Sequence, residues 1–155
     1  MALSQASQEP FWSRQPPPPG AGSLLLNIIW LVFAGFWLAI AYTLIGLVLC
    51  ILIITIPFGL QCFKLARFML WPFGRAVVRK PGADRPLRLI GNVVWFIFVG
   101  IEMAIAHLLT GVALCLTVIG IPLGLANFKL IPLILLPFGR EVVRRDQAQG
   151  RGVFF

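Results

Sequence analysis

Two ionisable side chains interrupt an otherwise apolar stretch in the second half of the chain. Glu102 is the only acidic residue inside an apolar span, and His107 follows five residues later. A charged carboxylate near the middle of a bilayer is costly, so such residues usually face a helix bundle's interior or water. Glu102 is therefore a candidate protonatable or cation-binding site on a pathway. The alternative is a neutral, hydrogen-bonded acid whose pKa is raised by burial.

His107 and Glu102 do not share a helix face, because five residues correspond to about 140° of rotation. The counterpart of His107 in the internal repeat described below is Tyr42. We expect both rings near the outer membrane interface, where His107 acts as an interfacial or interhelical hydrogen-bonding side chain.

Basic residues recur at matching places in two apolar segments. Lys64 and Lys129 each follow a proline by seven residues. They are candidates for an anion or anionic-lipid site near the cytoplasmic surface, and ordinary snorkelling of a long side chain is the alternative. Further candidates are arginines spaced four apart, which predict a basic face on a short helix against anionic headgroups or a simple topology-setting anchor. These are Arg75, Arg79, Arg140 and Arg144.

Two Pro-x-Gly sequences stand inside the long apolar runs, at Pro57 and Gly59 and again at Pro122 and Gly124. Proline removes a backbone donor and bends or ends a helix. In lipid such a break persists only where protein or water satisfies the freed backbone groups. Matching breaks in two repeats are a pointer to a membrane binding site or pathway.

Composition identifies the solvent as a bilayer. Apolar residues make up 59% of the 155 residues, charged residues 12%, and the mean hydropathy is +0.94. The net charge is +8, but basic residues flank apolar spans instead of covering a polar domain, which argues against nucleic-acid binding. No nucleophile constellation, phosphate loop or metal-ligand cluster is present, so we expect no enzyme activity, no metal and no cofactor.

The chain is an internal duplication. Residues 27–79 recur without a gap as residues 92–144, and about half of the positions are identical. Each copy opens with Asn-x-x-Trp and closes with Pro-Phe-Gly-Arg-x-Val-Val-Arg. Two copies of this length predict a paired membrane unit. Tryptophans near the span ends, Trp30, Trp71 and Trp95, fit interface belts.

Each apolar run is too long for one untilted span, because a helix rises about 1.5 Å per residue through a core roughly 30 Å thick. We expect an all-α integral membrane protein whose two tandem repeats each form a helical hairpin. The turn of the first hairpin should lie near Thr43 to Gly46, so that the second segment carries the Pro-x-Gly break. The alternative is one long tilted helix per repeat followed by a short interfacial helix.

The expected organisation has five parts. Residues 1–23 form a flexible, proline-rich arm, 24–79 the first membrane repeat, 80–88 a basic linker, 89–144 the second membrane repeat, and 145–155 a basic tail. The positive-inside rule places the linker and the tail in the cytoplasm. That arrangement requires an even number of crossings between them, which favours the hairpins.

The motif combination resembles the YccF-domain family. The residues that carry the resemblance are Asn-x-x-Trp, Ile-Pro-Phe-Gly-Leu-Gln-Cys-Phe-Lys-Leu (56–65), Trp-Pro-Phe-Gly-Arg (71–75) and Gly-Ile-Pro-Leu-Gly-x-x-Asn-Phe-Lys (120–129). The resemblance covers nearly all of residues 27–143. It implies a multi-pass bacterial inner-membrane protein, usually with two copies of the domain, and it brings no activity with it. The position of Glu102 is commonly aromatic in the family, as Trp37 is in the first repeat here.

Two functions fit these patterns. The first is a channel or transporter component, which needs a homo-oligomer because two hairpins enclose little of a pore. The second is a non-transporting scaffold that binds anionic lipid or a partner protein through its basic edges.

Overall fold

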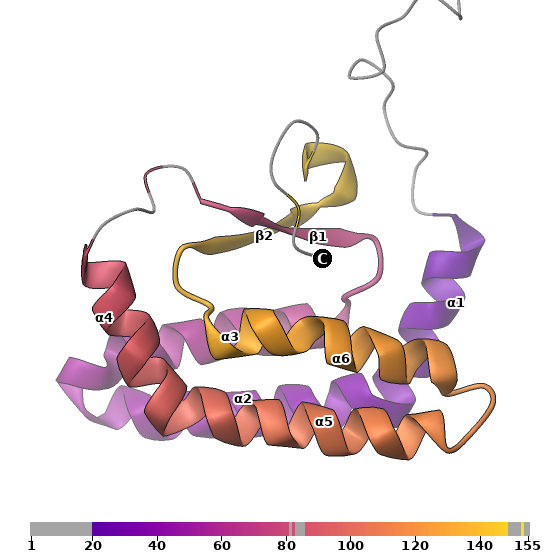
Figure 1. Ribbon diagram of the computed structural model, residues 1–155, viewed down its shortest axis with the longest axis horizontal. Helices are drawn as coiled ribbons and strands as arrows, with labels where there is room; N and C mark the ends of the chain where they lie inside the picture. Colours follow the sequence, from indigo (N-terminus) through magenta and orange to yellow (C-terminus); the bar gives the residue numbers. More distant parts are fainter. Residues whose placement is uncertain (1–19, 81, 83–85, 149–152, 154–155) are drawn as a thin grey trace, which may run out of the picture.

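The computed structural model describes residues 20–80, 82, 86–148 and 153 (Figure 1). The first repeat contains α1 (Ala21–Trp30), η3 (Leu31–Gly35), α2 (Phe36–Ile51), η4 (Ile53–Thr55), α3 (Ile56–Leu70) and β1 (Arg75–Arg79). The second contains α4 (Pro86–Trp95), η5 (Phe96–Gly100), α5 (Ile101–Cys115), α6 (Ile121–Leu135), β2 (Arg140–Arg144) and η6 (Arg145–Ala148).

Both repeats start with a long apolar helix that is bent by a π-helical turn. The segments η3 and η5 are these turns, and they join α1 to α2 and α4 to α5. A π-turn is a recognised cause of a kink, and Figure 1 shows α1 and α4 turning away from the helices that follow them. Within the described residues, three helices are long and apolar enough to cross a membrane: Ala21–Ile51, Ile53–Leu70 and Pro86–Cys115. The shorter Ile121–Leu135 is also apolar.

A helical hairpin per repeat is confirmed, but its turn lies elsewhere than expected. The prediction near Thr43 to Gly46 is wrong, because α2 continues to Ile51 and the chain reverses through η4. Pro57 lies in the first turn of α3, and Pro122 in the first turn of α6. Proline is favoured there because the first amides of a helix have no intrahelical partner. The Pro-x-Gly sequences therefore begin the second helix of each hairpin and do not break it at mid-depth.

The glycines of these sequences let the two helices of a hairpin approach closely. A Cβ on Gly59 would collide with the Cys50 sulfur and would lie 2.8 Å from the carbonyl oxygen of Gly46. The second hairpin repeats this contact with Gly124, Cys115 and the carbonyl of Gly111, at 2.6 Å. Small residues at such contacts are the usual means by which membrane helices pack.

The ends of the two repeats pair to form a two-stranded antiparallel sheet. The register matches Arg75 with Arg144, Val77 with Val142 and Arg79 with Arg140. The predicted short basic helix after each hairpin is therefore wrong. The sequence Arg-x-Val-Val-Arg contains adjacent β-branched residues, which favour strands, and the duplicate copy supplies the partner strand.

The sheet register shows that the repeats are related by an approximate two-fold axis. Val77 and Val142 are equivalent residues of the two repeats, and they face each other at the centre of the sheet. The hairpin turns lie at opposite ends of the molecule, and the sheet covers one side of the helices (Figure 1). Both strands thus lie on one side of the molecule. One crossing per repeat would place β1 and β2 on opposite sides of a membrane, whereas the two strands are hydrogen-bonded to each other.

The boundaries of the expected polar segments differ slightly from the structure. Residues 1–19 and four of the nine linker residues, 81 and 83–85, lie outside the described residues. The helix α1 begins at Ala21, inside the expected arm, and α4 begins at Pro86, inside the expected linker. In the tail, η6 follows β2 directly, and Val153 forms an isolated bridge with Val78.

Candidate functional site

The charged sheet is positioned by a tight turn at the end of each hairpin. The amide of Arg75 donates to the carbonyl of Pro72 at 3.2 Å, and Gly74 between them has φ 91°. This hydrogen bond and a positive φ at the third position are the features of a type II turn. The turn of the second repeat has the same features, with Arg140 donating to Pro137 at 3.4 Å and Gly139 at φ 83°.

An asparagine of the first helix clamps each turn. The Oδ1 of Asn27 accepts from the amide of Phe73 at 3.0 Å, and its Nδ2 donates to the carbonyl of the same residue at 2.9 Å. Asn92 makes the same pair of bonds to Phe138, at 3.0 and 3.2 Å. A side-chain amide thus pairs with a backbone amide, which satisfies polar groups that would be costly to bury unpaired.

The tryptophan of each Asn-x-x-Trp sequence acts with the asparagine. The indole N–H of Trp30 donates to the carbonyl of Met69 at 2.6 Å, and that of Trp95 donates to Ile134 at 2.7 Å. These carbonyls belong to the last turns of α3 and α6, where intrahelical donors run out. Both rings are fully buried, so their predicted place in an interface belt is wrong, whereas Trp71 is exposed.

The sheet presents its arginines on the face that looks toward the helices. Val77 packs into the helical core, as does Val142. Ala76 and Val78 pack instead against Ala148 on the other face. Because side chains alternate along a strand, Arg75 and Arg79 share the face of Val77, and Arg140 and Arg144 share that of Val142. The four arginines therefore surround a central valine pair on the helix-facing side.

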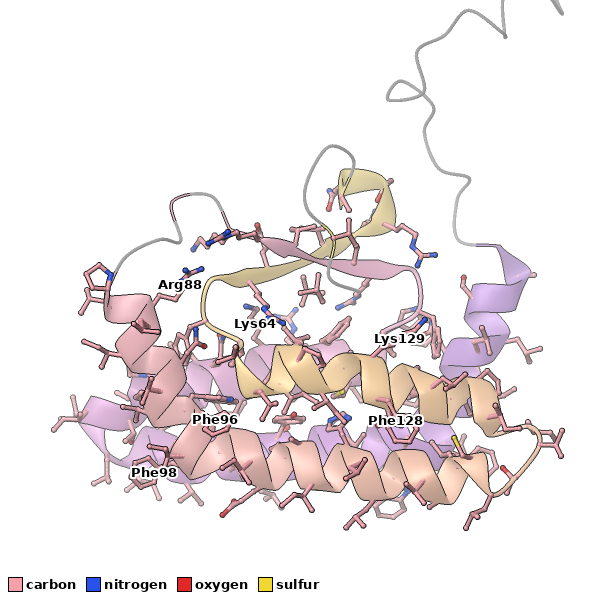
Figure 2. All side chains as sticks on the ribbon, viewed as in Figure 1. Lys64, Arg88, Phe96, Phe98, Phe128 and Lys129 are labelled. Carbon is pink, nitrogen blue, oxygen red and sulfur yellow. The ribbon has the colours of Figure 1, made fainter. Side chains whose placement is uncertain are left out.

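The two repeat-related lysines lie between the helices and the sheet but differ in their contacts (Figure 2). The ammonium of Lys64 donates to the carbonyl of Arg140 at 2.5 Å. The charges of Glu141 and Lys80 interact electrostatically with this ammonium group. Lys129 is exposed. Partial burial lowers the pKa of Arg140, although a guanidinium keeps its charge at any physiological pH.

His107 lies at the centre of the molecule and not near the outer interface, so that prediction is wrong. Its Nε2 is 3.5 Å from the hydroxyl of Tyr42, and its Nδ1 is 2.8 Å from Oδ1 of Asn127. All three side chains are fully buried. The row links α2, α5 and α6, so it joins the two repeats. His107 therefore forms hydrogen bonds between helices, which is one of the two roles that we expected for it.

Glu102 lies apart from this buried row. It is exposed on the surface of α5, whereas His107 on the same helix is buried. The two ionisable groups are therefore not brought together, as their spacing indicates. Among the described residues, no group of three His, Cys, Asp or Glu side chains could hold a metal ion.

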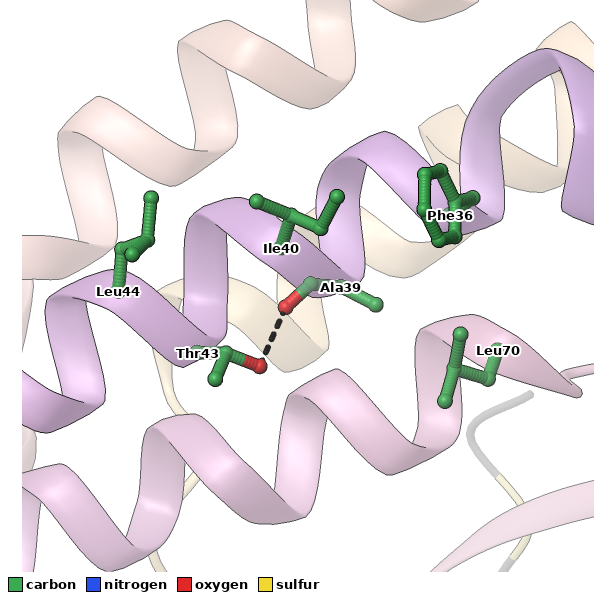
Figure 3. A pocket seen from close by; sticks show the side chains of 6 residues that line it. All are labelled: Phe36, Ala39, Ile40, Thr43, Leu44 and Leu70. Atoms are coloured by element: carbon green, nitrogen blue, oxygen red, sulfur yellow. Dashed lines mark hydrogen bonds between the residues drawn. The ribbon is translucent and has the colours of Figure 1, made fainter.

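The regions around the Pro-x-Gly sequences are apolar and exposed. Ile54 at the first hairpin turn is 87% exposed, and Val118 at the second is 86% exposed. A separate open groove of about 270 Å³ lies on the outer surface of α2, closed at one side by Leu70 of α3 (Figure 3). Its only polar side chain, Thr43, donates to the carbonyl of Ala39. The groove therefore suits an acyl chain and offers no chemistry.

The sequence predicts interhelical hydrogen bonding or helix capping for Asn127, but it does not pair this residue with His107. The counterpart of Asn127 in the first repeat is Cys62, so the duplication does not draw attention to it. Asn27 and Asn92, by contrast, recur together with Pro-Phe-Gly-Arg in both copies. That joint recurrence was the available signal for the clamp.

Comparison with known proteins assigns the family. The model of the YccF inner membrane component domain matches twice, at residues 25–75 and 90–140. The chain is 35% identical over 133 residues to the inner membrane protein YccF of Escherichia coli (strain K12), which covers 81% of this chain and 90% of the relative. The YccF protein of Shigella flexneri matches to the same extent. No solved structure matches the chain significantly.

The two matched segments coincide with the two structural repeats, each containing one helix pair and the turn that leads into its strand. Together they cover more than half of the chain. The chain therefore belongs to the YccF family, as a multi-pass inner-membrane protein built from two copies of the inner membrane component domain.

Proposed function

We propose that this protein is a membrane scaffold that binds anionic headgroups through the sheet formed by β1 and β2. The observation that carries the proposal is the placement of four arginines on the helix-facing side of this sheet, around Val77 and Val142. The strands themselves carry one carboxylate, Glu141. Guanidinium groups bind phosphate through paired N–H donors, and a basic segment next to a membrane is attracted to anionic lipid.

The same geometry supports a cytoplasmic location for the sheet. The positive-inside rule applies to basic segments next to membrane helices. Because β1 and β2 are hydrogen-bonded to each other, both basic segments lie on one side of the membrane. The inner leaflet of a bacterial membrane then supplies the anionic headgroups.

The channel interpretation has less support in a single copy of the chain. Every buried side-chain nitrogen and oxygen among the described residues has a hydrogen-bond partner. The core between the repeats is filled by large side chains, among them Trp30, Tyr42, Phe68 and Trp95. A pathway would therefore require a homo-oligomer. Ion or small-anion flux in proteoliposomes above that of empty vesicles, altered by Pro57→Ala with Pro122→Ala, would favour this alternative.

The scaffold proposal is tested by lipid retention in nanodiscs. The full chain is reconstituted in mixed phosphatidylethanolamine and phosphatidylglycerol, and the lipids that remain after transfer to detergent are counted by native mass spectrometry. We expect the protein to retain phosphatidylglycerol selectively, and we expect retention to fall with added salt because ions screen exposed charges. A fourfold variant with Arg75, Arg79, Arg140 and Arg144 changed to Gln should lose this selectivity.

Two controls separate binding from folding. The fourfold Arg→Lys variant keeps the charge and should keep most of the selectivity, while Arg67→Gln removes one basic residue on α3 and should change nothing. Unaltered lipid retention in the folded Gln variant would overturn the proposal.

A further inference from the structure

The duplication creates two equivalent corners of the sheet, and their charges differ. One corner is the start of β2 at Arg140, with Lys64 below it. The other is the start of β1 at Arg75, with Lys129 in the position equivalent to Lys64. Figure 2 shows both lysines in the space between the helices and the sheet.

The corner at Arg140 is satisfied within the chain. The ammonium of Lys64 donates to the Arg140 carbonyl and lies within the electrostatic reach of Glu141. Glu141 itself takes part in a further interaction. One carboxylate and one carbonyl therefore offset the positive charge at this corner.

Among the described residues, the corner at Arg75 lacks both the glutamate on its strand and a hydrogen bond from its lysine to the strand. The residue equivalent to Glu141 is Ala76, which is buried on the far face of the strand. The residue equivalent to Lys80 is Arg145, whose amide donates to the carbonyl of Gly74 as the amide of Lys80 donates to Gly139. The backbone is thus the same at both corners, and the second corner has alanine where the first has glutamate.

The environment of the two lysines reflects this difference. Lys64 is partly buried, whereas Lys129 is exposed and makes no hydrogen bond or ion pair with any described residue. The nearest acid in the sequence to this corner, Asp146, accepts from the amide of Gln147 at 3.1 Å. The repeat equivalence with Lys64 and Arg140 assigns the exposed Lys129 to the half-buried Arg75, and a phosphate can accept from both an ammonium and a guanidinium.

We propose that the corner formed by Lys129, Arg75 and Arg145 is a single binding site for the phosphate group of an anionic lipid. The equivalent corner at Lys64 binds no lipid, because the Arg140 carbonyl accepts from its ammonium and the charge of Glu141 partly offsets it. This site rests on the proposed function and makes it specific: headgroup binding is asymmetric, with one preferred phosphate per chain. The phosphodiester of phosphatidylglycerol is the intended ligand, since the lysine rises from a membrane helix.

The duplication supplies a matched control for the test. Lys129→Gln and Lys64→Gln remove the same side chain from equivalent positions. Native mass spectrometry of protein released from phosphatidylglycerol nanodiscs should show loss of the most tightly held lipid in Lys129→Gln. Lys64→Gln should keep that lipid and should instead lower the melting temperature, because it removes a contact between the repeats. Equal loss of lipid in both variants would overturn the asymmetry.

Three further variants change the charge at a corner without removing a lysine. Ala76→Glu gives the Arg75 corner the carboxylate of its counterpart and should release the bound lipid. Because a glutamate at the buried Ala76 could disturb the sheet, Arg145→Glu is the second variant, placed on the exposed start of η6, with the same expected loss. Glu141→Ala should raise the number of tightly held lipids.

The test also distinguishes this site from general attraction by the sheet. If the fourfold arginine variant loses lipid selectivity but Lys129→Gln and Arg145→Glu do not, the specific site is wrong and the scaffold proposal stands. If none of these variants alters retention, both fail. Competition by free glycerol phosphate, but not by the same concentration of chloride, would show a site for soluble phosphate esters in place of a lipid and would overturn the choice of ligand.

Discussion

The hydroxyl of Tyr42 lies 3.5 Å from Nε2 of His107, and these two residues occupy the same position in the two repeats. Their contact lies where the approximate two-fold axis crosses the helical core. The other ring nitrogen, Nδ1, is 2.8 Å from Oδ1 of Asn127, whose Nδ2 donates to the carbonyl of Leu123 at 3.3 Å. Since Oδ1 can only accept, Nδ1 carries the proton of a neutral ring and Nε2 accepts from Tyr42.

This directionality predicts unequal effects of mutation on stability. His107→Phe keeps the volume of the ring but leaves Oδ1 of the fully buried Asn127 unpaired, at a cost of about 1–3 kcal/mol. Tyr42→Phe removes a bond at the long limit of hydrogen-bond geometry and should cost less than about 1 kcal/mol. The measurement is thermal unfolding in detergent followed by circular dichroism.

The exposed Glu102 supplies the control on the same helix, because Glu102→Gln should leave the unfolding temperature unchanged. A larger loss of stability in Tyr42→Phe than in His107→Phe would contradict the proton arrangement described above.

A second prediction concerns the clamp on the turn. Asn27→Ala removes both bonds to the backbone of Phe73. We expect a loss of about 1–3 kcal/mol in the free energy of unfolding, because a buried amide and carbonyl lose their partner. Asn92→Ala should have a similar effect through Phe138. Chemical unfolding in mixed micelles provides the measurement.

Asn27→Asp is the informative comparison for the clamp. It retains an acceptor for the amide of Phe73 but loses the donor to its carbonyl. With a neutral carboxyl group, the stability of Asn27→Asp should lie between those of the wild type and Asn27→Ala. With an ionised carboxylate, it should lie at or below that of Asn27→Ala. The stability of the variant should therefore improve as the pH is lowered. A variant with full stability at neutral pH would show that the second bond contributes nothing.

A third prediction concerns the close contact within each hairpin. Gly59→Ala places a methyl group against the sulfur of Cys50 and the carbonyl of Gly46. Overpacking of this kind typically costs about 1–3 kcal/mol. Because the sulfur is the nearer obstacle, Cys50→Ala should restore part of the stability when the two changes are combined. Gly22→Ala, with no atom within 4 Å of the added carbon, is the matched control and should be neutral.

The sequence predicted the hairpins and the duplication well, because long apolar runs and repeated motifs are local signals. It misplaced the turn of the first hairpin, since Pro57 was interpreted as a break within a helix when it is the start of one. A break within a helix and the start of a helix are both explained by the missing N–H of proline. Only the position at which the chain reverses direction between the two helices distinguishes them. The sheet was missed for another reason. Its partner strands are far apart in the chain, and arginines four apart lie on one face of a helix as well as of a strand.

The buried row of Tyr42, His107 and Asn127 was also not predicted from the sequence. Tyr42 and His107 were expected near the interface because amphipathic rings often lie there. Their burial follows from the way the two repeats pack across the axis, which no local pattern encodes. The clamp could have been predicted more fully, since Asn-x-x-Trp and Pro-Phe-Gly-Arg recur together in both copies.

The last prediction tests the sheet register itself. In a background with Cys50, Cys62 and Cys115 replaced by alanine, Val77→Cys with Val142→Cys should form an intramolecular disulfide on mild oxidation. Paired residues of antiparallel strands have Cα atoms about 4.5–5.5 Å apart, within the range that a disulfide spans. The product is recognised by faster migration on a denaturing gel, reversed by reductant. Val77→Cys with Glu141→Cys is the control, because these residues are one position out of register and point to opposite faces. Efficient crosslinking of the control, with none in the matched pair, would show that the strands pair in another register and that the four arginines do not share the helix-facing side.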